Sequence, residues 1–432
     1  MKRRIYLLFL MFAGIVLMVQ AEQTKRTLTA KDTINDESIS IPESLSEANI
    51  DSLLSSWMID QQVMPDKECL SSDEDPYFPE EVYIQRLADL PTIIEMPYNQ
   101  IVRSFIDLYT TRRRGLVQYM LGMGQFYFPF FEQELDAYDM PQELKYLPII
   151  ESALNPVAVS RAGATGLWQF MLPTGKIYGL ESNSLMDERR DPVKSTHAAV
   201  KYLKDLYEIF QDWNLAIAAY NCGPGNVNKA IKRSGGKTDY WEIYYYLPKE
   251  TRGYVPAFIA ANYVMNYYWA HNICPVIADF SYTSDTITVT NRIHFQQIAD
   301  ILEIPIEELR SLNPQYKKDI IPGGEYNQCM LRLPITCAHN FIAMQDSINN
   351  YRSSELIARR TTVEPVEMDL TRNAQKNGAK GQGIKTYHKV RSGETLSKIA
   401  GKYKVSVNQL KSWNHLKTTK IKIGQKLVVY NS

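Results

Sequence analysis

The feature that most constrains the fold is a repeat in the last third of the sequence. Eight mostly apolar positions between Phe295 and Asn313 recur between Leu396 and Asn414, at a constant offset of 101 residues (396 − 295). Their spacing within each copy predicts a strand, two short helices and a second strand. Two copies at one offset therefore predict two small α+β (βααβ) modules, which we place at 278–338 and 385–431.

The chain before these modules has the pattern of a mainly α domain, which we place at 77–272. Asp191-Pro192 is typical of a helix start, with the cap at Asp191 and proline in the first turn. The apolar segment that begins at Trp213 ends where Gly223 follows Cys222, which puts Tyr220 and Asn221 at a helix end. The polar segments 22–76 and 339–384 are predicted to be linkers.

One acidic residue lies in the segment Lys145–Met171, and it follows an apolar run. This residue is Glu151, and the pair Asn155-Pro156 stops any helix shortly after it. Glu151 is therefore predicted in the last turn of a helix, where apolar surroundings and the negative end of the helix dipole both disfavour a carboxylate. Such a glutamate stays protonated nearer neutral pH, as a general acid requires. The alternative is a solvated glutamate at a helix end.

The N-terminus has the pattern of an export signal. Lys2, Arg3 and Arg4 precede an apolar run from Ile5 to Val19, and Ala21 completes a cleavage site, so we predict a signal peptide at 1–21. An uncleaved anchor is the alternative, although the run is shorter than a membrane span. We expect an exported protein of the periplasm or outer cell envelope.

Charge and residue counts exclude several classes of partner. Lys plus Arg and Asp plus Glu both number 48, which does not favour a nucleic acid or an acidic partner. The six histidines are scattered along the sequence, and we expect neither a metal site nor a cofactor. The five cysteines do not predict a disulfide framework, though one bridge remains open. The 28 tyrosines suit a sugar-binding cleft as well as core packing.

Three separated motifs together resemble a known family. Glu151-Ser152, Gly166-Leu167-Trp168-Gln169 and Ala218-Ala219-Tyr220-Asn221 occur in the order found in the soluble lytic transglycosylase (SLT) domain of family 1 lytic transglycosylases, which has a lysozyme-like fold. The segments ELKYLPIIESALNP and LPKETRGYVP most resemble the membrane-bound lytic transglycosylases of type D. The second repeat, from Tyr387, resembles a LysM module, whereas the first departs from that pattern, with Arg292-Ile293-His294 in place of Gly393-Glu394-Thr395.

The resemblance implies an activity and a set of site residues. It implies a lytic transglycosylase that cleaves the β-1,4 bond between N-acetylmuramic acid and N-acetylglucosamine in peptidoglycan and leaves 1,6-anhydromuramyl ends. Glu151 would be the single acid and base, and the residues that hold the acid and the sugar would be Ser152, Gln169, Tyr220, Asn221 and Tyr254. The LysM module would bind N-acetylglucosamine-containing glycan and so anchor the protein to it. Association of the protein with the membrane or the cell wall is a further expectation. The first copy is left open as a structural spacer.

Two other functions remain open from the sequence. Ordinary glycosidases need two carboxylates, and the sequence has no second acid between Glu151 and Glu181. A hydrolase of the same fold would have to use Glu181, Asp187 or Asp191, which lie in a charged stretch that we expect to be exposed to solvent. The third function is that of a non-catalytic scaffold that binds the cell wall.

Overall fold

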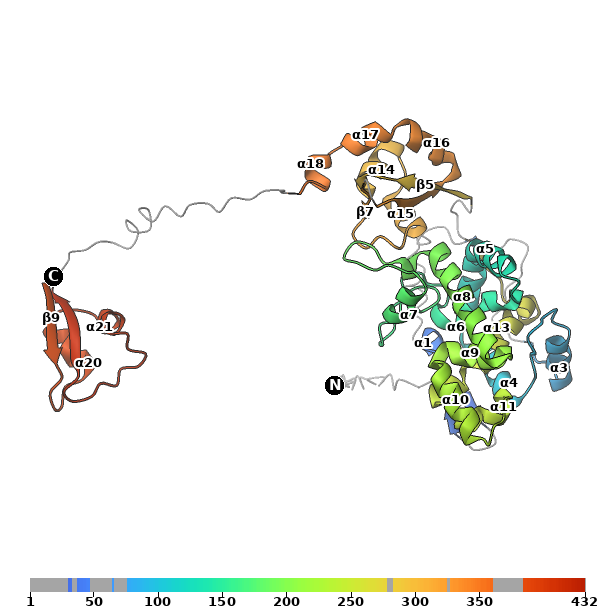
Figure 1. Cartoon of the computed structure of the whole chain (residues 1–432), viewed down its shortest axis with the longest axis horizontal. Helices are drawn as coiled ribbons and strands as arrows, with labels where there is room; N and C mark the ends of the chain where they lie inside the picture. Colours follow the sequence, from blue (N-terminus) through green and yellow to red (C-terminus); the bar gives the residue numbers. More distant parts are fainter. Residues whose placement is uncertain are drawn as a thin grey trace, which may run out of the picture. The chain divides into compact units, whose positions relative to one another are not determined.

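The computed structural model describes residues 30–32, 37–46, 64–65, 76–277, 283–324, 327–359 and 384–431. The chain divides into two compact units, Met1–Ala358 and Arg359–Ser432 (Figure 1). The predicted signal peptide at 1–21 lies outside the described residues. In the ranges that the structure describes, no helix has the length and apolar character needed to cross a membrane.

The first unit contains a helical domain built around one buried helix. Every residue from Tyr254 to Met265 of α13 is buried, and this helix packs against α4, α6 and α9. Because α13 is apolar on all sides, the surrounding helices must each present an apolar face to it. The helices of this domain are α3 (Glu80–Ala88), α4 (Gln100–Asp107), the π-helix η1 (Leu108–Arg112), α5 (Arg114–Ala137), η2 (Gln142–Tyr146), α6 (Leu147–Ser152), α7 (Leu172–Ile177), η3 (Glu188–Arg190), α8 (Pro192–Phe210), α9 (Trp213–Cys222), α10 (Pro224–Arg233), α11 (Tyr240–Ile243), η4 (Tyr244–Tyr246), α12 (Lys249–Arg252), α13 (Tyr254–Tyr267) and η5 (Tyr268–His271).

Local residues set the predicted start of α8 and the predicted end of α9. The Asp191 carboxylate accepts hydrogen bonds from the backbone N–H groups of Val193 and Lys194, so α8 starts where the sequence predicts. At the other predicted boundary, α9 ends at Cys222, and Gly223 follows with a φ of 83°. Few other residues adopt that backbone angle without strain, so the glycine turns the chain sharply after the helix.

Part of the predicted linker 22–76 belongs to the helical domain. Strands β1 (Ala30–Asp32) and β2 (Glu37–Ile39) pair antiparallel and lead to the short helix α1 (Glu43–Ser46). Ile39 and Leu45 are buried in the core of the helical domain, and the Ser44 hydroxyl donates to the Ile150 carbonyl at 2.6 Å. Residues 37–46, which we call the N-terminal strap, are thus packed structure and do not form a spacer. A further short pair joins β3 (Met64–Pro65) to β4 (Val276–Ile277).

The first repeat forms a βααβ module with two additional helices. Strands β5 (Ser284–Val289) and β8 (Cys329–Pro334) pair antiparallel around α14 (Phe295–Leu302) and α15 (Ile306–Leu312). A smaller pair joins β6 (Arg292–His294) to β7 (Ile320–Pro322). Helices α16 (Ile335–Ala343) and α17 (Gln345–Asn350) bury Phe341 and Ile348 in the module core, and α18 (Ser353–Leu356) follows. The module therefore extends beyond the predicted boundary at 338 into the predicted linker.

The second repeat has the same arrangement in the second unit. Strands β9 (Ile384–Lys389) and β10 (Lys426–Asn431) pair antiparallel, with α20 (Leu396–Lys402) and α21 (Val407–Trp413) between them in sequence. Asn313 in the first module and Asn414 in the second make equivalent hydrogen bonds to the end of α15 or α21 and to the last strand. The predicted fold class, a mainly α domain followed by two βααβ modules, is confirmed.

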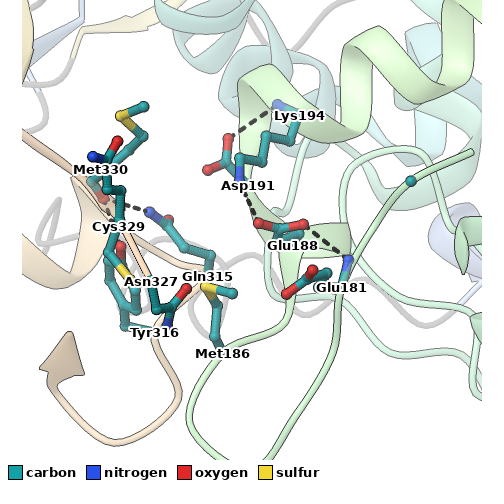
Figure 2. Close-up of a pocket in the computed structure, with 12 residues that line it drawn as sticks. Glu181, Met186, Glu188, Asp191, Lys194, Gln315, Tyr316, Asn327, Cys329 and Met330 are labelled. Carbon is teal, nitrogen blue, oxygen red and sulfur yellow. Dashed lines mark hydrogen bonds and ion pairs between the residues drawn. The ribbon is translucent and has the colours of Figure 1, made fainter. Parts of the chain in front are cut away.

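A small polar cavity of about 200 Å³ lies where the first module meets the helical domain. Glu181, Glu188 and Asp191 line it from the helical domain, and Gln315, Tyr316 and Cys329 line it from the module (Figure 2). Glu188 is buried and forms an ion pair with Lys194, and its carboxylate also accepts from the Glu181 N–H. The Glu188 and Asp191 carboxylates of this cavity therefore already have partners within the chain.

Candidate active site

Glu151 lies in the last turn of α6, as predicted. The helix is short because Ala153 and Leu154 adopt left-handed backbone angles, with φ of 52° and 61°, before Pro156. Its residues Leu147, Ile149 and Ile150 are buried in the core. Glu151 is therefore the polar tip of an apolar helix, and its half-buried side chain faces a cavity.

That cavity has a volume of about 630 Å³ and collects residues from distant parts of the sequence. The predicted residues Glu151, Gln169, Tyr220, Asn221 and Tyr254 all line it. Its walls also include Ser40 to Glu43 of the N-terminal strap, seven residues between Ser160 and Thr174, and Glu250. A cavity of this size that combines aromatic and polar side chains is typical of a site for a small polar ligand or a sugar.

The surroundings of Glu151 keep its carboxyl protonated near neutral pH. Burial raises the pKa of Glu151 from 4.5 to about 7, and this effect outweighs a hydrogen bond from the Tyr254 hydroxyl, which lowers it. Burial also raises the pKa of Tyr254 well above 10, so its hydroxyl remains a neutral donor. Glu151 can consequently donate a proton at neutral pH and remain stable as a carboxylate after the transfer.

Tyr220 and Asn221 lie at the end of α9, and each links this helix to another wall of the cavity. The Tyr220 hydroxyl donates to the Trp168 carbonyl at 2.8 Å. The Asn221 side-chain oxygen accepts from the Thr251 hydroxyl at 2.9 Å, which leaves its amide NH₂ group for other partners. These bonds fix the helix end against α12 and the segment around Gln169.

Gln169 reaches the cavity from a tight loop. Its own backbone is left-handed, with φ of 46°, and its side-chain amide donates to the Gly166 carbonyl at 2.8 Å. Gly166 has a φ of 89°, and a Cβ atom there would lie 1.7 Å from the Arg189 carbonyl oxygen. Only glycine therefore allows this loop to pass so close to the segment that carries Arg189.

Ser152 is the one predicted site residue that does not line the cavity. It is buried, and its hydroxyl lies 2.9 Å from the Leu167 carbonyl and 3.1 Å from the Pro148 carbonyl. The Ser152 hydroxyl thus links the helix that carries Glu151 to the loop that carries Gln169, and so holds the two in position.

The sequence reasoning missed two carboxylates that line the same cavity. Glu43 comes from the N-terminal strap, and Glu250 from the start of α12. Glu250 could have been found, because it belongs to the segment LPKETRGYVP that was already singled out. Glu43 had no signal beyond the apolar residues Ile39, Ile41 and Leu45 in a polar stretch.

The charged stretch Glu181–Asp191 differs from the expectation that it is exposed. Asp187 and Asp191 are only 2% and 4% exposed, and neither lines the cavity at Glu151. Asp187 pairs with Arg189, whereas Asp191 caps α8, which explains how both carboxylates tolerate burial. Glu181 is exposed but lies at the polar cavity near the first module.

Cysteines and metal ligands add little to the site. Cys274 is disulfide-bonded, whereas Cys222 is a free thiol on the cavity wall whose pKa is raised by burial. Among the described residues, no cluster of three or more His, Cys, Asp or Glu side chains could hold a metal ion.

Comparisons with known families recognise three domains in the chain. Residues 128–243 match the transglycosylase SLT domain, residues 283–350 match the LysM-like domain of lytic transglycosylase MltD, and residues 388–429 match the LysM domain. The three matches follow the order of the helical domain and the two modules.

Two individual relatives and one solved structure match parts of the chain. Membrane-bound lytic murein transglycosylase D of Escherichia coli K12 is 33% identical over 297 residues, which cover 67% of this chain and 60% of that protein. Soluble lytic murein transglycosylase of the same strain is 33% identical over 124 residues, or 27% of this chain and 19% of that protein. The match to the crystal structure of the soluble lytic transglycosylase SLT70 of Escherichia coli has 20% sequence identity and a TM-score of 0.32. The match covers 52% of this chain and 42% of that chain. The chain thus spans about three fifths of the type D relative.

Proposed function

We propose that this chain is a lytic transglycosylase of peptidoglycan. It carries a transglycosylase SLT domain, followed by an MltD-type LysM-like domain and a LysM domain. The observation that carries the proposal is the raised pKa of Glu151 together with its place on the cavity wall. A carboxyl with a pKa of about 7 at the wall of a large cavity suits a group that must act as acid and base in one reaction.

The reaction that fits one such group has two proton transfers. Glu151 donates its proton to the glycosidic oxygen between N-acetylmuramic acid and N-acetylglucosamine, and that bond breaks. The acetamide carbonyl of the muramic residue assists at the anomeric carbon. The Glu151 carboxylate then takes the proton of the 6-hydroxyl, whose oxygen closes a 1,6-anhydro ring. No water is consumed, and the glutamate ends as it began.

The residues around Glu151 have separate roles in this proposal. Tyr254 donates to the carboxylate, and so stabilises it during the interval between the two proton transfers. Gln169, Tyr220 and Asn221 line the cavity from two other segments and are placed to bind the sugar. Ser152 holds the helix of the acid against the loop of Gln169.

The second unit and the cellular location complete the proposal. The C-terminal module has the LysM pattern, and we assign it the binding of N-acetylglucosamine-containing glycan strands. Its many lysines also favour attraction to an anionic polymer. The name of the type D relative describes a membrane-bound enzyme, and we infer a location in the cell envelope for this protein as well.

The test is mass spectrometry of the muropeptides that the protein releases from purified sacculi. We expect 1,6-anhydromuramyl products from the native protein and a loss of at least ~10²-fold in rate for Glu151→Gln, because proton transfer is removed. Glu81→Gln, an exposed carboxyl on α3, is the matched control and should keep full activity. Near-full activity of Glu151→Gln would contradict the assignment.

A hydrolase is the second candidate, because Glu43 and Glu250 line the same cavity as Glu151. Either carboxylate could activate water on the opposite side of the bond, as in ordinary glycosidases. Reducing-end products that depend on one of these two residues would establish the hydrolase. Anhydro products that persist in Glu43→Gln and Glu250→Gln would exclude it.

A further inference from the structure

The first LysM-like module is joined to the helical domain by backbone hydrogen bonds. The Asp187 N–H donates to the Gln315 carbonyl at 2.9 Å, and the Lys317 N–H donates to the Leu185 carbonyl at 2.8 Å. Between these bonds, Met186 of the helical domain is buried in the hydrophobic core of the module. Because one residue of the catalytic domain completes the module's core, the two parts form a continuous packed structure.

Lys317 extends this junction with its side chain. Its ammonium group donates to the Asn183 carbonyl at 2.8 Å and lies 3.7 Å from the Asp187 carboxylate. The Asp187 carboxylate in turn accepts from the Arg189 Nε at 3.0 Å and from its Nη2 at 2.8 Å, in a bidentate ion pair. Burial raises the pKa of Asp187, but the hydrogen bonds and charge of Arg189, and then the charge of Lys317, hold it below its usual value. The Asp187 carboxyl is therefore ionised at neutral pH.

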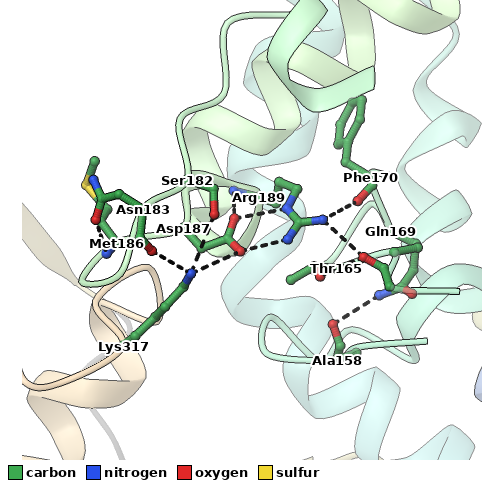
Figure 3. A network of polar contacts seen from close by, with 12 residues as sticks. Ala158, Thr165, Gln169, Phe170, Ser182, Asn183, Met186, Asp187, Arg189 and Lys317 are labelled. Atoms are coloured by element: carbon green, nitrogen blue, oxygen red, sulfur yellow. Dashed lines mark hydrogen bonds and ion pairs between the residues drawn. The ribbon is translucent and has the colours of Figure 1, made fainter. Parts of the chain in front are cut away.

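Arg189 carries the connection onward to the catalytic cavity. Its guanidinium donates to the Gly163 carbonyl at 3.1 Å and to the Phe170 carbonyl at 3.0 Å, the two ends of the loop that presents Gln169. Gly166, in the middle of that loop, packs against the Arg189 backbone. Figure 3 shows the path from Lys317 through Asp187 and Arg189 to Phe170 and the neighbouring Gln169.

The second module contains a loop equivalent to the one that contacts the helical domain in the first. In both modules the residue after the second helix is an asparagine, Asn313 or Asn414, whose side-chain amide donates to a carbonyl of the last strand. At the offset of 101 residues, the buried Pro314, Gln315 and Tyr316 correspond to His415 and Lys417, which are exposed, and to Leu416, which is half-buried. The loop that contacts the helical domain in the first module is thus more buried than its counterpart in the second module.

We infer that the LysM-like module, residues 283–350, is a positioning part of the catalytic site, in which Lys317 acts through Asp187 and Arg189 to hold the Gly163–Phe170 loop and Gln169 in place. Its docked loop is occupied by the helical domain, so this face does not bind glycan. The kinetic consequence rests on the proposed function, whereas the structural coupling does not.

The first experiment measures hydrogen exchange in the full-length protein. In Lys317→Ala we expect exchange about threefold faster or more in peptides covering 163–170, because the loop loses a support. Lys317→Arg should restore protection, since arginine also pairs with carboxylate and carbonyl oxygens. Lys318→Ala removes an equal charge from the exposed neighbouring residue and should change nothing. Faster exchange confined to 182–187 and 315–317 would overturn the inference.

The second experiment measures kcat and KM on soluble glycan strands with the same three variants. A displaced Gln169 loop should raise KM roughly three- to tenfold in Lys317→Ala, because a sugar contact is misplaced. Partial unfolding would lower kcat alone. A KM in Lys317→Ala equal to that of Lys318→Ala would contradict the positioning role. If the native protein cleaves no glycan, the proposed function fails, and the exchange experiment still decides the coupling.

Discussion

Replacing Glu151 with glutamine is expected to stabilise the folded protein at alkaline pH while it removes activity. The folded state raises the pKa of Glu151 from 4.5 to about 7, mainly through burial. Below pH 4.5 the group is protonated in both the folded and the unfolded state. Between pH 4.5 and 7 the unfolded chain has released a proton that the folded protein still holds, so the free energy of unfolding falls as pH rises.

The size of this effect follows from the pKa. A rise from 4.5 to about 7, at ~1.4 kcal/mol for each tenfold change in proton affinity, corresponds to about 3 kcal/mol. The side chain is half-buried and touches solvent in the cavity, so we expect about 1.5–3 kcal/mol. Glutamine has nearly the same shape and no charge, so it should recover this free energy above pH 7 and almost none of it at pH 4.5.

The assay is thermal unfolding of the native protein and Glu151→Gln at pH 4.5 and pH 8. The variant should unfold roughly 3–12 °C higher at pH 8, from the usual dependence of Tm on stability for a domain of this size. Glu250→Gln, at an exposed residue on the same cavity, is the matched control for the change of charge. An equal gain at both pH values, or none at pH 8, would refute the argument that burial controls this carboxyl.

Other substitutions test the remaining contacts. Tyr254→Phe removes a hydrogen bond that lowers the pKa of Glu151, so the pH profile of kcat/KM should move upward and the rate should fall about tenfold; an unchanged profile would contradict this role. Ser152→Ala leaves a buried carbonyl unpaired and should cost ~1–3 kcal/mol in urea unfolding, whereas a raised KM without lost stability would mean that the residue contacts sugar. Leu45→Ala should cost ~2–5 kcal/mol, since the residue is fully buried, and a neutral result would mean that the N-terminal strap is not packed. A chain ending at residue 359 should still cleave soluble strands but sediment less with sacculi; unchanged sedimentation would argue against an anchoring LysM module.

Several features were predictable because they depend on neighbouring residues. Asp191-Pro192 started α8 and Gly223 ended α9 because capping and left-handed turns are local properties of the backbone. The two modules were predictable because a repeat at one offset preserves the apolar pattern of each copy. Glu151 was placed in the last turn of a helix by the sequence around it.

Other features depended on contacts that no local pattern encodes. Glu43 reaches the cavity because the N-terminal strap packs on α6, about a hundred residues away in sequence. Ser152 was predicted to help hold the acid and the sugar, but the direction of its hydroxyl, away from the cavity, depends on the distant Leu167 carbonyl. Asp187 belongs to a charged stretch that looked exposed, yet Arg189 and Lys317 allow it to be buried. A charged side chain is buried only where partners converge on it, and their convergence is a property of the tertiary structure.

The sequence by itself determined several helix ends, the two repeated modules and the place of Glu151 in the last turn of a helix, because these follow from capping, periodicity and composition. Only the tertiary structure decided the chemistry of that residue. It surrounds Glu151 with buried side chains and brings the Tyr254 hydroxyl, from 103 residues away, onto its carboxylate. The pKa of a carboxyl depends on its distance from water and from other charges, and those distances exist only after the chain has folded.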